Sequence, residues 1–235
     1  GKLYLGTFNP TGGELWSYDS TVAVGSQWRL IKKFSPVNGS NFPANLYHPA
    51  VTELTVFNGK LYVGLGGAGV DYLRVYDGTT LTPVANLPTL TSSTNIGVLK
   101  LFASSQGLLY IGCVDFAGFN LQTMDKLGAF STVTATGFAN SANAYAWSMV
   151  EYNGRTFVGT FNTGFFSQLP RGSAELWYSD DSINWQQMAL PLDFGFWNYG
   201  IRTMTIANNT FRDLLVTIRP QAGTVELTNV GAGTL

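Results

Sequence analysis

The chain has 235 residues, of which 45% are hydrophobic and only 11% are charged, and its formal net charge is −1. This balance excludes a basic surface for nucleic acid and a polybasic membrane anchor. A single cysteine, Cys113, excludes an intrachain disulfide, and a single histidine, His48, argues against a zinc site of the usual Cys/His type.

Other composition features indicate where the protein works. No apolar stretch approaches the roughly 20 residues that a membrane-spanning helix needs. The low charge and the many turn-forming residues favour an extracytoplasmic protein, either extracellular or periplasmic, or at the cell surface. Cys113 lies in the apolar run LLYIGCV, so we expect a buried and inert thiol. His48 is expected to be an ordinary loop residue, and no cofactor is predicted.

A six-residue motif recurs along the chain. It reads GKLYLG at 1–6, GKLYVG at 59–64, GLLYIG at 107–112 and GRTFVG at 154–159. Strand-rich repeats of roughly 40–50 residues are typical of β-propellers. We therefore predict an all-β, five-bladed propeller with four antiparallel strands in each blade. It forms a single domain over 1–235, divided into modules 1–44, 45–94, 95–142, 143–197 and 198–235.

The predicted strands follow in chain order. Module one has strands at 2–7, 14–18 and 28–32, and it lacks the strand that precedes the motif in later modules. The next three modules have four strands each. Those of module two are at 53–57, 61–64, 72–76 and 82–85, and those of module three are at 97–103, 109–113, 120–124 and 131–134. Those of module four are at 146–151, 156–160, 175–179 and 185–189. Module five begins with strands at 201–207 and 214–218. Asn-Gly pairs at 58–59 and 153–154 predict tight hairpins.

The missing strand of module one leaves two alternatives. Residues 224–230 (TVELTNV) resemble 52–57 (TELTVF), which precedes the motif in module two. Our hypothesis is that this C-terminal segment pairs with residues 2–6 and so closes the ring. The alternative is a trimmed chain or a fragment that has lost blades, which its abrupt start in a strand motif favours.

One turn resembles that of a known family. Ser179, Asp181 and Trp185 resemble the aspartate box of sialidase-like propellers, although the spacing is one residue short and the family's glycine is absent. The resemblance implies that Asp181 caps a hairpin and that Trp185 packs between blades. It assigns no sialidase catalytic residue here. The blade pattern is also similar to that of Kelch-type and fungal fucose-lectin propellers.

In such propellers, the loops that enter each inner strand and the loops after each second strand share one face. An asparagine recurs in the entry loops, at 45, 95, 143 and 198. These asparagines either cap their own turns or form, with neighbouring aromatic rings, a surface for sugar hydroxyls and pyranose faces. The candidate ligand-binding residues are Asn9, Asn45, Tyr47, Asp115, Asn143, Tyr145, Trp147, Asn162, Trp197, Asn198 and Tyr199.

We therefore expect a non-enzymatic extracytoplasmic binding module for carbohydrates or surface glycans, with no catalytic or metal-binding residue. The first alternative is a structural or protein-interaction domain of a larger surface assembly or filament. The second is a propeller glycoside hydrolase, which requires two facing carboxylates. Among Glu53, Asp71, Asp115 and Glu151, only Asp115 is well placed for that chemistry.

Overall fold

The structure is a computed structural model that describes residues 1–9, 11–34, 50–66, 72–90, 94–164, 173–190 and 198–207. The chain divides into two compact units, Gly1–Met204 and Thr205–Leu235. All strands of the described residues belong to the first unit and pair antiparallel, which confirms the all-β propeller fold.

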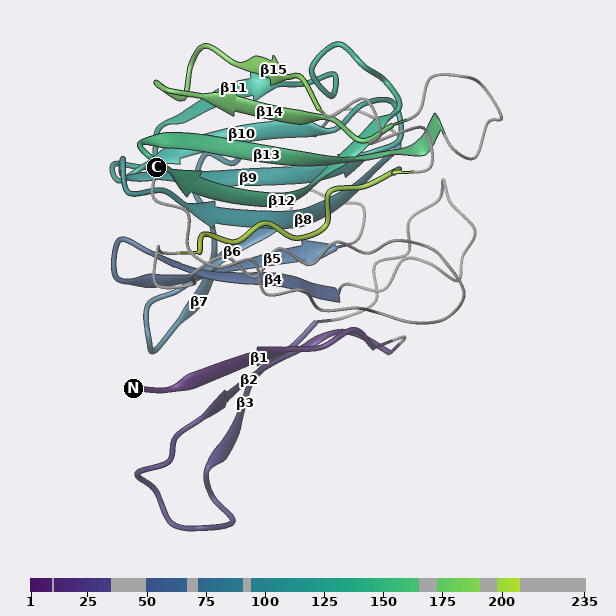
Figure 1. Ribbon diagram of the computed structural model, residues 1–235. Helices are drawn as coiled ribbons and strands as arrows, with labels where there is room; N and C mark the ends of the chain where they lie inside the picture. The colour runs from purple at the N-terminus through teal and green to yellow at the C-terminus, as the bar shows by residue number, and fades with distance from the viewer. Residues whose placement is uncertain are drawn as a thin grey trace, which may run out of the picture. The chain divides into compact units, whose positions relative to one another are not determined.

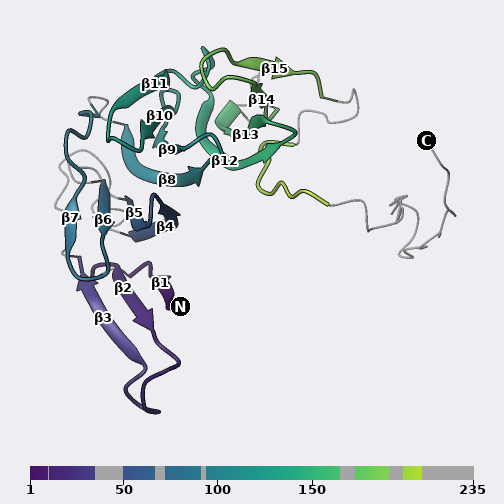
Figure 2. The same ribbon diagram turned by 90° about the vertical axis from the view of Figure 1, so that its left-hand side faces the viewer.

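The described residues of the first unit form four successive blades (Figures 1 and 2). Blade one holds β1 (Leu3–Gly6), β2 (Glu14–Tyr18) and β3 (Trp28–Lys33). Blade two holds β4 (Ala50–Phe57), β5 (Lys60–Gly66), β6 (Leu73–Tyr76) and β7 (Leu81–Pro83). Blade three holds β8 (Asn95–Ala103), β9 (Leu108–Asp115), β10 (Asn120–Asp125) and β11 (Phe130–Thr134). Blade four holds β12 (Asn143–Tyr152), β13 (Arg155–Asn162), β14 (Leu176–Ser179) and β15 (Gln186–Met188).

Blade one differs from the others, as predicted. The recurring motif forms β1, β5, β9 and β13, and the last three of these each pair with an inner strand, β4, β8 or β12. Within the described residues, β1 pairs only with β2. The hypothesis that residues 224–230 pair with β1 concerns a segment outside the described residues.

Successive blades are joined by a contact that occurs twice. Gly66 at the end of β5 pairs with Gly97 in β8, and Phe161 in β13 pairs with Gly200 in the same way. A hydroxyl of one blade supports each contact, because Thr52 Oγ1 donates to the Val98 carbonyl at 2.6 Å and Ser148 Oγ donates to the Ile201 carbonyl at 2.6 Å. Residues 198–201 therefore take the place on blade four that the start of β8 takes on blade two.

The core of the described residues lies at the blade boundaries. One cluster joins blades one and two through Leu15, Val51 and Val63, and a second joins blades two and three. A third, between blades three and four, includes Tyr110 and Val158. The motif strands β5 and β9 thus each pack one face against the preceding blade and the other against the following blade. Cys113 belongs to the second cluster, and burial raises the pKa of its thiol.

The turns at the other end of the blades follow the predicted chemistry. Asn58 and Asn153 have φ angles of 49° and 50°, as a two-residue hairpin requires. Asp181 caps the β14–β15 turn, because its Oδ1 accepts the N–H groups of Ile183 at 2.9 Å and Asn184 at 2.7 Å. The ring of Trp185 packs between blades, against those of Tyr110 and Phe138. The roles expected for Asp181 and Trp185 are confirmed.

Candidate functional site

Most candidate residues that the structure describes lie at one end of the blades, which we call the loop end. It is defined by the starts of the inner strands and the ends of the motif strands. The antiparallel register brings these points together, because Asn95 pairs with Asp115 in blade three and Asn143 pairs with Asn162 in blade four. The opposite end carries the Asn-Gly hairpins.

In blade four, the asparagines form a closed hydrogen-bond network. Asn143 Nδ2 donates to the Gly137 carbonyl at 2.9 Å and to Glu175 Oε2 at 2.7 Å. Asn162 Nδ2 donates to Asn143 Oδ1 at 3.0 Å, and Asn162 Oδ1 accepts the Gly164 N–H at 2.9 Å. Both side chains are fully buried. These contacts match the alternative in which the asparagines hold the loops.

The sequence reasoning missed Glu175, which stands at the centre of this network. Its carboxylate accepts Asn140 Nδ2 at 2.6 Å and Trp177 Nε1 at 2.8 Å in addition to Asn143. The pattern recurs in blade one, where Glu14 accepts Trp16 Nε1 at 3.0 Å. The repeated Glu-Leu-Trp triplet was the sequence signal that could have predicted this pair.

Asp115 takes the place in blade three that Asn162 takes in blade four. Its Oδ1 accepts the Ala117 N–H at 2.8 Å and the hydroxyl of Thr94. The side chain is 6% exposed, and so is the side chain of Asn95 opposite it. A neutral amide is sufficient for this turn in blade four. In blade three, the same position holds a carboxylate, which lacks the N–H that Asn162 donates across the pair.

The register changes the alignment of the predicted asparagine ring. Val51, Val98 and Ala146 oppose Leu65, Cys113 and Thr160, which occupy the same place in the three motif strands. Counting back three residues gives His48, Asn95 and Asn143. In module two this count reaches His48, whereas the sequence comparison had aligned Asn45 with the other asparagines. His48 and Asn45 lie outside the described residues, as do Tyr47 and Trp197.

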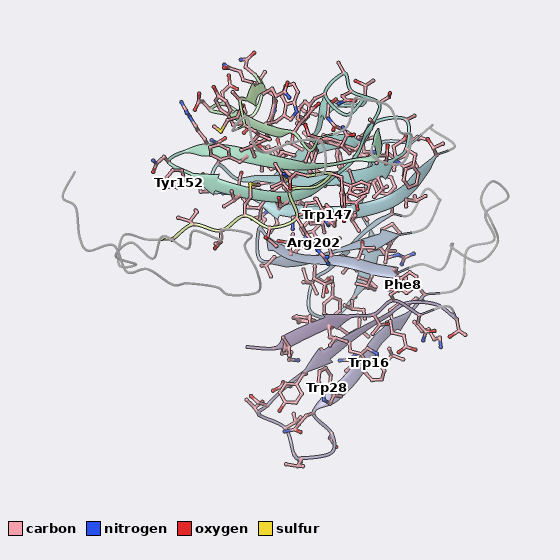
Figure 3. The ribbon with its side chains drawn as sticks, turned by 45° about the vertical axis from the view of Figure 1, so that its right-hand side comes forward. Phe8, Trp16, Trp28, Trp147, Tyr152 and Arg202 are labelled. Atoms are coloured by element: carbon pink, nitrogen blue, oxygen red, sulfur yellow. The ribbon has the colours of Figure 1, made fainter. Side chains whose placement is uncertain are left out.

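Aromatic side chains form a cluster beside the asparagines of blade four. The rings of Tyr145 and Phe161 stack with centroids 4.5 Å apart, and the ring of Trp147 meets Phe161 at 5.1 Å. The rings of Tyr199 and Phe161 meet edge-to-face, and Tyr199 is 41% exposed. The Arg202 guanidinium lies 5.4 Å from the centroid of the Trp147 ring (Figure 3). Burial raises the pKa of Tyr145 to about 12, with a smaller opposing effect of Arg202.

Two further candidates lie at the loop end with different roles. Asn9 is half-buried, and its Oδ1 accepts the N–H and the hydroxyl of Thr11, each at 2.9 Å. Asn198 is exposed, and its carbonyl accepts the Ala174 N–H at 2.7 Å. The structure thus brings Asn143, Asn162, Tyr145, Trp147 and Tyr199 together, while Asp115 belongs to the neighbouring blade.

The other acidic candidates are engaged in contacts between blades. Glu53 forms an ion pair with Lys100 of the next blade at 2.9 Å. Glu151 accepts the Ser105 N–H at 2.7 Å near the hairpin end, away from the asparagines. Asp71 lies outside the described residues. At the loop end, the Asp115 carboxylate accepts hydrogen bonds from two groups, Thr94 and Ala117. The Glu175 carboxylate accepts hydrogen bonds from three side chains.

No group of three or more His, Cys, Asp or Glu side chains in the described part of the chain could hold a metal ion. Nor does this part include a helix that is long and apolar enough to cross a membrane.

Comparisons with known proteins add similar solved structures. No protein-family model matches the chain, and no curated protein matches it. A thermostable family-43 glycoside hydrolase is 14% identical, with a TM-score of 0.45 over 80% of this chain and 68% of that one. A GH43 enzyme of a Bacteroides ovatus xyloglucan locus is 15% identical, with a TM-score of 0.44 over 81% of this chain and only 39% of its own. An endo-arabinase of Bacteroides thetaiotaomicron is 11% identical, with a TM-score of 0.42 over 81% of this chain and 76% of its own.

These findings correct the expected function. The sequence favoured a non-enzymatic binding module, whereas several of the similar structures are glycoside hydrolases and another is a prolyl endopeptidase. The specific likeness to sialidase-like, Kelch-type or lectin propellers stays a resemblance of blade pattern.

Proposed function

We propose that the chain is the propeller of an extracellular glycoside hydrolase that binds its glycan at the loop end. The observation that carries the proposal is the buried carboxylate of Asp115 at a position where blade four has an amide. A buried charge costs several kcal/mol unless it is compensated. Since an amide suffices for the same turn in Asn162, a carboxyl group at Asp115 calls for a functional reason.

Asp115 supplies one of the two carboxylates that glycoside hydrolysis requires. Thr94 and the Ala117 N–H both contact Oδ1, and this holds the side chain in one orientation. Glu175 is not the second acid in this proposal, because its oxygens already accept bonds from Asn140, Asn143 and Trp177. Asp71, which precedes the third strand of blade two, is the sequence candidate for that role.

The aromatic cluster supports a glycan as the substrate class. At the loop end Tyr199 is 41% exposed and Trp147 is half-buried, and exposed aromatic surface packs against the apolar face of a sugar ring. Their neighbours Asn143 and Asn162 are buried and hydrogen-bonded, so they support the loop and leave substrate contact to the rings.

The test is release of reducing ends from arabinan, xylan, galactan and xyloglucan. Asp115→Asn is expected to lower the rate at least about 100-fold, the usual minimum for loss of an acid–base group. Its melting temperature should stay within a few degrees, because asparagine holds the same turn in blade four.

Asp125→Asn is the matched control. Asp125 caps the turn after β10 in the same blade, where its Oδ1 accepts the Leu127 N–H at 2.8 Å and the Ala129 N–H at 2.9 Å. This variant should keep the wild-type rate. No hydrolysis of any glycan by the wild-type chain, or equal rates for Asp115→Asn and wild type, would contradict the proposal.

A further inference from the structure

A row of polar side chains lies in the boundary between blades two and three. Asn120 of β10 is paired with Cys113 of β9 (Figure 1). Two residues further along β10, Gln122 is paired with Ile111. Directly paired residues share one face of a sheet, and Cys113 and Ile111 belong to the core cluster between blades two and three. Both amide side chains therefore face blade two. Asp115 follows Cys113 by two residues and lies on the same face. We call Asp115, Asn120 and Gln122 the polar strip.

The amide oxygens of the polar strip are buried without a donor. Within the described part of the chain, neither Asn120 Oδ1 nor Gln122 Oε1 has a hydrogen-bond partner. The Gln122 side chain is only 3% exposed. A buried acceptor that has left water and gained no donor lowers the stability of a fold, so native proteins nearly always provide one. Two such oxygens on one face of one strand therefore call for a donor.

The neighbouring side chains do not supply that donor. Tyr72 of blade two packs in the same cluster, but it donates its hydroxyl proton to the Pro88 carbonyl at 2.6 Å. Burial raises the pKa of Tyr72, and the adjacent Gln122 side chain opposes this rise. Cys113 carries only a weak S–H donor, and Met124, the next residue of β10 on this face, has none.

The polar strip reaches the Asp115 carboxylate at its loop end. Burial raises the pKa of the Cys113 thiol and the charge of Asp115 raises it further, which places the carboxylate near Cys113. The hydrogen bonds that Asp115 accepts from the described residues Thr94 and Ala117 both end on Oδ1. Asp115 Oδ2 thus adds a third acceptor oxygen that the described residues leave without a donor.

We propose that ordered water occupies the polar strip, donates to the Asn120 and Gln122 oxygens and extends to the Asp115 carboxylate. Alternate residues of a strand lie roughly 7 Å apart, a span that one or two water molecules bridge with hydrogen bonds of about 2.8 Å. Water also suits an amide at either end, because it both donates and accepts. This site goes beyond the proposed hydrolase activity, since water binds there whether or not the chain acts on a glycan.

Oxygen-17 magnetic relaxation dispersion of the glycan-free chain tests the proposal, because it counts the water molecules that stay in a protein for longer than it takes to tumble. Gln122→Leu and Asn120→Leu each replace one acceptor by an apolar group of similar shape. Each variant should hold about one long-lived water molecule fewer than the wild type. Gln187→Leu is the matched control. Gln187 is exposed on β15, so this variant should keep the wild-type count.

Circular dichroism verifies the fold of each variant. Gln122→Met, which keeps an unbranched side chain of the same length, takes the place of Gln122→Leu if the leucine variant unfolds. Gln122→Met also removes the amide, so it should show the same loss of bound water.

Three results would overturn the proposal. The first is an equal water count in the wild type and both strip variants. The second is a higher melting temperature of Gln122→Leu at an unchanged water count, which would show that Gln122 Oε1 is buried without any donor. The third is a wild-type melting temperature that rises with potassium or sodium chloride but not with choline chloride, an effect absent from Gln122→Leu. That result would assign the strip to a cation. No glycan enters these measurements, so their failure is distinguishable from failure of the proposed function.

Discussion

At the residue scale, Asp115 and Asn162 occupy the same position in two blades and differ in one group, a carboxylate in Asp115 and an amide in Asn162. Both cap the turn after the motif strand, and only the asparagine also donates across to its neighbour. The sequence shows an acid at this place but not its burial, which depends on Thr94 and Asn95 from another strand. Asn143 was predicted as a candidate, whereas its partner Glu175 comes from beyond a long loop and could not be paired with it from sequence spacing.

Asp181 leads to a prediction on pH. Hydrogen bonds from the Asn184 and Ile183 N–H groups hold the pKa of this carboxyl well below its usual range. A carboxyl with a lowered pKa in the folded state contributes stability above its unfolded pKa of about 3.9, and that stability is lost as pH falls toward the folded value. The melting temperature of the wild type should therefore fall between about pH 5 and pH 2.

Asp181→Ala should lower the melting temperature at pH 7 and flatten its fall in acid, measured by thermal unfolding at steps of half a pH unit. Asp180→Ala is the matched control, because Asp180 makes an exposed ion pair with Arg155 and caps no turn. Identical pH profiles for Asp181→Ala and Asp180→Ala would contradict the assigned role of Asp181.

At the element scale, the glycine that ends the motif has a steric reason. A Cβ at Gly64 would lie 2.7 Å from Val98 Cγ1, and one at Gly159 would lie 2.7 Å from Ile201 Cβ. Val98 belongs to β8 of the following blade, whereas Ile201 follows the bridge at Gly200 and the predicted strand at 201–207 does not form. The motif glycine therefore reflects contact with the segment that follows each blade as well as strand structure. Repetition made the strands predictable, whereas this contact is visible only once the blades are placed side by side.

Gly64→Ala should destabilise the chain by about 1–3 kcal/mol through overpacking against Val98. The double variant Gly64→Ala/Val98→Ala should recover part of that loss, because the second change removes the clashing methyl groups. Gly112→Ala is the matched control. There the following blade supplies Ala146, whose Cβ would be 3.4 Å from the new methyl group, and a smaller loss is expected. Urea unfolding compares the wild type, Gly64→Ala, Val98→Ala, the double variant and Gly112→Ala, and strictly additive effects of the Gly64 and Val98 changes would contradict the account.

At the scale of the whole molecule, the repeat predicted the propeller and the incomplete first blade. The candidates of module two, Asn45 and Tyr47, lie outside the described residues and stay predictions. The sequence favoured a binding function over a catalytic one. The repeat gives no information on this choice, because one fold serves many functions. Asparagine and aromatic residues suit both a lectin and a hydrolase, and the acid that distinguishes them occurs at a single repeat position.

Hydrogen–deuterium exchange of the Asp115→Asn chain, with and without the glycan that the wild type hydrolyses, tests the central claim most directly. The account predicts slower exchange of amides at the loop end, in residues 94–97, 115–117, 143–147 and 198–200. Exchange at the hairpin end, in residues 58–59, 105–107 and 153–154, should not change. Protection confined to the hairpin end would contradict the assignment of the loop end as the glycan site.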